Sequence, residues 1–188
     1  MTALHTSPAT TRKRRMLQIL TAGALATGAL VAGPTGQAFA DGPNFVQVRL
    51  SGTIVNSDDD GLNNRPTTTT RFTRTVTLLT SPAASRTKVV KIAGACAGGE
   101  VRSELQVTLT YNPTSNKVVV NGAVPLGNGL RLFEGTSCDT TDLDGTSGFA
   151  PTTFTQPNSS TTLQLVAQTG EAFSIDAAVA DLKIERLV

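Results

Sequence analysis

The chain has almost no histidine. Its single histidine, His5, lies within the first 40 of 188 residues, a segment that we interpret below as an export signal. Without histidine, the rest of the chain can assemble neither a Ser-His-Asp nor a Cys-His nucleophile, and it lacks the commonest metal-binding side chain. The sequence therefore argues against the common hydrolase classes and against a histidine-bound metal.

Aromatic residues are also scarce. Tryptophan is missing, and the chain has one tyrosine and seven phenylalanines. Tryptophan and tyrosine supply flat apolar faces on which sugars stack, and they dominate many protein interfaces. Their scarcity lowers the expectation of a glycan-binding module. Valine, leucine and threonine are prominent instead, and this composition is typical of β-strands.

The N-terminal segment has the features of an export signal. Basic residues occupy positions 13–15, a weakly apolar stretch follows over 16–33, and the small residues Ala38 and Ala40 mark a cleavage site. We predict that residues 1–40 are removed on export. The adjacent arginines fit the general secretory route as well as the twin-arginine route, and the sequence leaves this choice open.

The remaining residues, 41–188, have the length of one domain. The signal contains four of the 16 basic residues and none of the 14 acidic ones, so the remainder carries a formal net charge of −2. A near-neutral domain gives no electrostatic reason to expect nucleic acid or anionic membranes as partners. We predict a single secreted domain with no membrane span, whose partner is an unidentified extracellular protein or surface ligand.

Apolar and polar residues alternate with a period of two along most of 41–188. The pattern predicts an all-β fold, an antiparallel β-sandwich of seven or eight strands, with a β-barrel as the alternative. We expect the segment 136–160 to be a long irregular loop. The last run fits a strand better than a helix, and a phase slip near Ala180 predicts a β-bulge. The expected strands are 46–54, 72–78, 88–92, 101–111, 117–124, 130–133, 163–167 and 173–188.

Two cysteines, Cys96 and Cys138, are predicted to form one disulfide, because the chain is exported. Free thiols and an intermolecular bridge are the alternatives. Successive antiparallel strands alternate in direction, so the bridge requires Cys138 to lie at the same end of the sandwich as Cys96. This holds only if residues 117–134 climb in one direction, interrupted but not reversed at 125–129.

The same alternation of strand direction brings two acidic segments to one end of the sandwich. Calcium prefers six to eight oxygen ligands on flexible loops, and a weak site is useful outside the cell, where calcium is plentiful. Aspartate, asparagine and glycine are also ordinary turn residues, so solvated turns are the alternative. The candidate calcium ligands are Asp58, Asp59, Asp60, Asp139, Asp142 and Asp144.

These observations favour a secreted, non-catalytic β-sandwich module with an extracellular binding or structural role, with calcium as a candidate ligand. One alternative is an inhibitor of a secreted protease that presents a proline-containing loop such as 149–156. The other is a small hydrolase that uses a pair of carboxylates. Glu100, Glu104, Asp142 and Asp144 are the candidates for such a pair, and no catalytic residue is selected among them.

Overall fold

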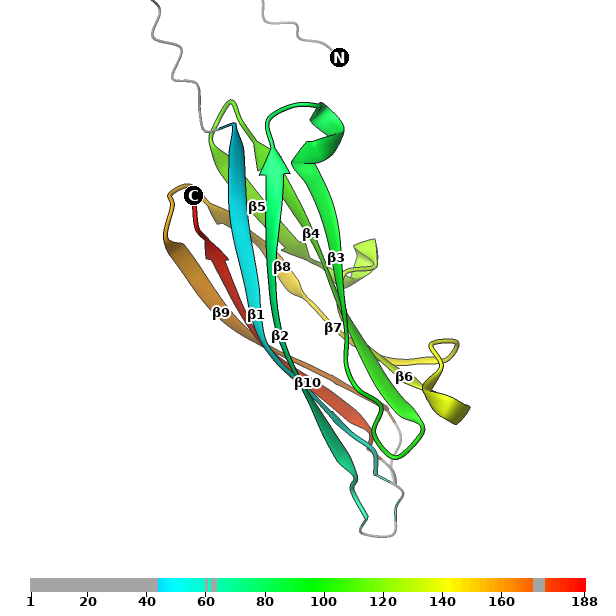
Figure 1. The fold of residues 1–188 in the computed structure, drawn as a ribbon. Coiled ribbons are helices and arrows are strands. Elements are labelled where there is room, and N and C mark those ends of the chain that lie inside the picture. The colour runs from blue at the N-terminus through cyan, green and yellow to red at the C-terminus, as the bar shows by residue number, and fades with distance from the viewer. Residues whose placement is uncertain (1–43, 60, 62–63, 171–174) are drawn as a thin grey trace, which may run out of the picture. The chain divides into compact units, whose positions relative to one another are not determined.

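The computed structural model describes residues 44–188 except 60, 62–63 and 171–174. The predicted export signal, residues 1–40 with Ala38 and Ala40, and the candidate ligand Asp60 lie outside the described residues. The described part consists of two antiparallel sheets, which Figure 1 shows as two layers. The predicted all-β fold is therefore confirmed.

Sheet A has four strands in the order β2-β1-β10-β9. Strands β1 and β2 pair without interruption from Phe45↔Leu79 to Ser57↔Thr67. The other neighbours are also antiparallel and in continuous register. The strands of this sheet are β1 (Phe45–Ser57), β2 (Thr67–Leu79), β9 (Ser159–Gln168) and β10 (Ala177–Arg186).

Sheet B is built around the long strand β4 (Val101–Asn112). One side of β4 pairs with β3, and the other side pairs with β5 and β6. Strand β8 pairs with β5, and β7 pairs with β6. The remaining strands are β3 (Thr87–Ala93), β5 (Lys117–Gly122), β6 (Gly129–Glu134), β7 (Leu143–Ser147) and β8 (Phe149–Phe154). Three short 3₁₀ turns connect strands: η1 (Ala83–Arg86), η2 (Val124–Leu126) and η3 (Thr136–Cys138).

The hydrophobic core lies between the two sheets. Alternate residues of β1 and β4 are fully buried, as period-two alternation predicts for strands with one covered face. Burying a side chain such as Leu50 or Leu105 contributes about 1.5–3 kcal/mol. Polar groups also cross the interface: Ser103 Oγ donates to Asn56 Oδ1 at 2.6 Å, and both residues are fully buried. This contact ties β1 of sheet A to β4 of sheet B.

The directions of the strands follow the prediction made from the cysteine pair. Both β5 and β6 are antiparallel to β4, so they run in the same direction. The segment between β5 and β6 contains η2 and interrupts the strand without reversing the direction of the chain. The interruption requires glycine at two positions, because Gly127 and Gly129 adopt positive φ values of 73° and 91°, which other residues rarely adopt. The prediction that residues 117–134 climb as one interrupted strand is confirmed.

Three details of the sequence prediction are wrong. The described residues contain ten strands rather than seven or eight, because the expected loop 136–160 holds β7 and β8. These two strands lie near the margin of sheet B and are mostly exposed, so they lack an apolar alternation. No bulge occurs at Ala180, because β10 keeps an unbroken register with both neighbours and Val179 faces outward.

Among the described residues, no helix is long and apolar enough to cross a membrane.

Candidate functional site

The predicted disulfide is present and marks the acidic end of the sandwich. Cys96 lies in the connection between β3 and β4, and Cys138 lies in η3 just after β6. Their Cα atoms are 5.8 Å apart, within the usual range for a disulfide. The bridge therefore joins two loops of sheet B at the end where the acidic segments were expected to meet.

A first acidic cavity of about 200 Å³ lies between the loop after β1 and the loops of sheet B. Asp58, Asp59 and Asp176 are at least nine-tenths buried, which is unusual for carboxylates. The described lining residues are Asp58, Asp59, Asn64, Pro66, Gly98, Glu100, Glu134 and Asp176.

Polar contacts hold the walls of the first cavity. The Asp59 carboxylate forms an ion pair with the Arg65 guanidinium at 2.6 Å. The backbone amide of Asp59 donates a hydrogen bond to Asp176 Oδ1 at 2.7 Å. The amide of Asp176 in turn donates to Thr169 Oγ1 at 3.2 Å. These contacts link the loop after β1 to the segment before β10. The buried carboxylates are thus part of an ordered network.

Gly98 lets the Asp58 carboxylate lie directly against the backbone of the β3–β4 connection. A Cβ atom at this position would stand 1.5 Å from Asp58 Oδ2, and the φ angle of Gly98 is +59°, a conformation that other residues rarely adopt. A side chain at position 98 would therefore displace Asp58. The glycine brings a loop of sheet A into contact with a loop of sheet B.

A second cavity of about 320 Å³ lies beside the first and shares Glu100 and Glu134 with it. The backbone amide of Glu134 donates to Asp144 Oδ2 at 3.0 Å, and the amide of Gly135 donates to Glu100 O at 3.2 Å. These bonds join the end of β6 to β7 and to the residue that precedes β4. The described lining residues are Glu100, Glu134, Gly135, Thr136, Asp142 and Asp144.

The predicted ligands are thus divided between two neighbouring cavities. Asp58 and Asp59 line the first, and Asp142 and Asp144 line the second. Asp139 lines neither: it accepts bonds from the hydroxyl and amide of Thr141, and these hydrogen bonds lower its pKa. Within the described part of the chain, no three acidic, cysteine or histidine side chains converge closely enough to hold a metal ion. Calcium binding therefore remains a prediction.

Sequence reasoning missed Glu134 and Asp176, and it named Glu100 only as a candidate for a catalytic carboxylate pair, not as a member of the acidic cation site. Each is an isolated acidic residue next to a strand end, and none lies in a cluster of aspartates. The alternation of strand direction could have placed two of these residues at the acidic end. Glu100 precedes β4 and Glu134 ends the antiparallel β6, so both must lie at the end that holds Cys96 and Cys138.

Two residue groups named for the alternative functions lie outside both acidic cavities. Glu104 lies on the face of sheet B that points away from the core and forms ion pairs with Arg131 and Lys91, so it does not join the acidic cavities. The bait loop proposed for a protease inhibitor is largely β8, which pairs with β5. Only the short turn after Phe154 remains irregular in that segment.

The sequence matches no family model, and no curated protein and no solved structure is significantly similar to the chain.

Proposed function

We propose that the protein is an exported, non-catalytic β-sandwich module that binds or supports a partner outside the cell, with calcium stabilising its acidic end. The convergence of acidic loops from both sheets around Glu100 and Glu134 carries this proposal. Calcium takes carboxylates, backbone carbonyls and water as ligands. A weak site can therefore use two or three carboxylates and complete its shell with other oxygens.

Export is supported by the disulfide, because such bridges form and persist mainly in oxidising compartments. It is also supported by the signal-like sequence of residues 1–40. The hydrolase alternative draws on Glu100, Asp142 and Asp144, which share the second cavity. Its described lining consists of carboxylates, Gly135 and Thr136, whereas substrate pockets are lined mostly by apolar and aromatic side chains. The cavity therefore favours an ion over an organic substrate.

Adding millimolar calcium is expected to raise the melting temperature of the oxidised protein, and EDTA is expected to reverse the rise. A ligand that binds only the folded state stabilises it by about 2.7 kcal/mol at a hundredfold excess over its dissociation constant. Differential scanning calorimetry of the same sample with calcium, with magnesium and with EDTA measures the shift. Magnesium is expected to act less, because it demands stricter octahedral geometry and gives up its water reluctantly.

Three matched variants locate the effect. Asp58→Asn alters the first cavity and Asp144→Asn alters the second, whereas Asp181→Asn removes a carboxylate from the outer face of sheet A. Only the first two are expected to reduce the calcium-dependent shift. A shift that is equal in all three variants, or no shift at all, would make the acidic segments ordinary solvated turns.

A further inference from the structure

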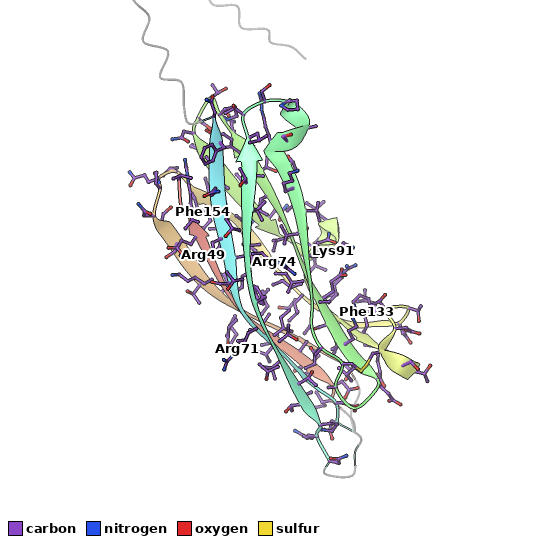
Figure 2. The ribbon with its side chains drawn as sticks, in the orientation of Figure 1. Arg49, Arg71, Arg74, Lys91, Phe133 and Phe154 are labelled. Atoms are coloured by element: carbon purple, nitrogen blue, oxygen red, sulfur yellow. A yellow bond between two sulfur atoms is a disulfide. The ribbon has the colours of Figure 1, made fainter. Side chains whose placement is uncertain are left out.

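The outer face of sheet B, the face that points away from sheet A, carries a group of cations around one carboxylate. Residues paired across strands share a face, and the register pairs Glu104 with Arg131 and Arg102 with Phe133. Lys91 of β3 lies on the same face, paired with Gln106. We call Lys91, Arg102, Glu104, Arg131 and Phe133 the sheet B cluster. Figure 2 shows Lys91 and Phe133 on this side of the sheet.

The sheet B cluster has an excess of positive charge. Glu104 accepts ion pairs from both Arg131 and Lys91, the second at 3.5 Å. Arg102 is half-buried and has neither an ion-pair nor a hydrogen-bond partner among the described residues. The cluster therefore holds three cations and one carboxylate, and the carboxylate pairs with only two of them. A charge that is partly withdrawn from water without a partner is a cost that native proteins rarely leave uncompensated.

Two buried polar atoms of the sheet B cluster lack an acceptor. Among the described residues, the buried side-chain nitrogen and oxygen atoms without a hydrogen-bond partner are Arg102 Nε and Arg131 Nε. Most buried donors in native structures are paired, so each exception calls for an explanation. Both exceptions here are guanidinium groups, and they lie on neighbouring strands of one face. Both Nε atoms are closed off from solvent, so a carboxylate supplied from outside would pair with the Nη groups of the guanidinium fork, whose geometry it fits.

Apolar side chains flank the sheet B cluster. Val89 of β3 is 56% exposed and Leu143 of β7 is 51% exposed, and their partners in the register place both on the outer face. Between them, the Arg131 guanidinium lies 5.5 Å from the centre of the Phe133 ring. Arginine and aromatic side chains ringed by apolar contacts are the typical composition of the energetic centre of an interface.

The outer face of sheet A differs in one respect: within the described part of the chain, none of its buried side-chain donors lacks a hydrogen-bond partner. Thr73, Thr75 and Thr77 of β2 occupy it, and its arginine at position 49 is already paired with Glu185 at 2.6 Å. Glu185 also forms an ion pair with Lys183 at 3.6 Å, whereas Arg71 on the same face is exposed to water and has no described partner. The contrast indicates that sheet B, not sheet A, presents the recognition surface.

We propose that the outer face of sheet B binds an acidic segment of an extracellular protein, with a carboxylate of that segment on Arg102 and apolar residues against Val89 and Leu143. The proposal rests on the proposed function, because it names the partner class of a binding module. Charge complementarity selects the occupant. A second copy of the chain joined symmetrically through this face would place cation against cation, which is repulsive.

The test titrates the isotope-labelled oxidised protein with a synthetic peptide of alternating glutamate and leucine, followed by backbone amide NMR. A second peptide carries glutamine in place of each glutamate. We expect the acidic peptide to shift amide signals of β3, β4 and β6 on sheet B and to leave β2 unchanged. The glutamine peptide is expected to bind at least tenfold more weakly, and raising the salt concentration is expected to weaken the acidic peptide.

Two single variants separate this face from general charge attraction. Arg102→Gln is expected to weaken binding of the acidic peptide about tenfold, because the unpaired guanidinium is its anchor. Arg71→Gln removes an exposed arginine without a described partner from the outer face of sheet A, and it is expected to change nothing. Unchanged melting temperatures would show that both variants keep the fold.

Several results would overturn the proposal. They are equal binding of the two peptides, shifts that map to sheet A, an unaffected Arg102→Gln variant, or concentration-dependent self-association through the sheet B cluster. None of them bears on the calcium-dependent melting of the acidic end, which is measured without peptide. Failure of this surface is therefore distinguishable from failure of the proposed function.

Discussion

Replacing Cys96 and Cys138 together by serine is expected to lower the free energy of unfolding by about 4 kcal/mol. The two cysteines are 42 residues apart in the sequence, and the loop that they close contains β4, β5 and β6. Without the bridge the unfolded chain gains conformational freedom, whereas the strand pairing of the folded state is unchanged. Urea unfolding of the oxidised protein and of the double variant measures the difference.

Reduction of the unaltered protein provides the matched control for this prediction. It is expected to give the same loss as the double serine variant, because both remove only the cross-link. The dependence of unfolding free energy on urea is expected to become steeper, since the unbridged unfolded chain exposes more surface. A loss below about 1 kcal/mol in both samples would contradict the prediction, because it would mean that the bridge adds little to the contacts already holding these loops.

The strand directions could be predicted from sequence because two constraints acted together. Period-two alternation located β1, β4 and β5, whose inner faces are buried. The cysteine pair then required residues 117–134 to climb without reversal, and β6 satisfies this by pairing with the first half of β4. A long-range covalent constraint thus fixed a topological choice that local pattern alone leaves open.

The strands β7 and β8 could not be predicted because burial does not shape their sequences. The register of β7 with β6 shifts once, and that of β8 with β5 shifts once, so neither strand presents a continuous inner face. Pro151 within β8 also argued against a strand, although proline is tolerated near the edge of a sheet. Their strand conformation comes from backbone pairing with β5 and β6.

The candidate site was half predictable for a similar reason. Runs of aspartate next to glycine are visible in the sequence, so Asp58, Asp59, Asp142 and Asp144 were identified. Their division between two cavities depends on where Glu100 and Glu134 stand, and this follows from the pairing of β4 with β6. Residue type therefore identified the acidic loops, and tertiary register decided which of them share a cavity.

For Arg186, the alternation of β10 predicts that the side chain points inward, but the sequence does not predict which groups it contacts. It is in phase with the inward-facing residues Ala180, Leu182 and Ile184 of β10, and it is fully buried. Its partners come from the other sheet: Nη1 donates to Asn116 O at 2.8 Å and to Phe154 O at 3.4 Å. Alternation predicts an inward arginine but not the carbonyl groups that receive it.

The Arg186→Ala variant is expected to have a free energy of unfolding lower by about 2–5 kcal/mol, because the change opens a cavity and leaves acceptors without their donor. The guanidinium also donates from Nη2 to Asn116 Oδ1 at 2.7 Å and from Nε to Val188 O at 3.1 Å. Removing it takes a donor from the buried Phe154 carbonyl and from the half-buried Asn116, and it opens a cavity between β10 and the β4–β5 turn. Burial lowers the pKa of Arg186, the direction expected of a cation taken from water into this polar nest. Urea unfolding measures the loss.

A control variant at a second arginine and a double-mutant cycle test whether the loss comes from the contacts of Arg186 with sheet B. The alternative is that removing any arginine costs as much. Arg49→Ala, on the outward side of β1, is expected to cost far less because its ion pair with Glu185 is open to water. Asn116→Gly removes the Oδ1 acceptor while keeping the backbone at its φ of 49°, which glycine adopts readily. Combining Asn116→Gly with Arg186→Ala is expected to show a coupling of about 1 kcal/mol or more, because both changes break the same contact. Additive losses, or an Arg186→Ala variant no less stable than Arg49→Ala, would show that core packing alone holds sheet A to sheet B at this end.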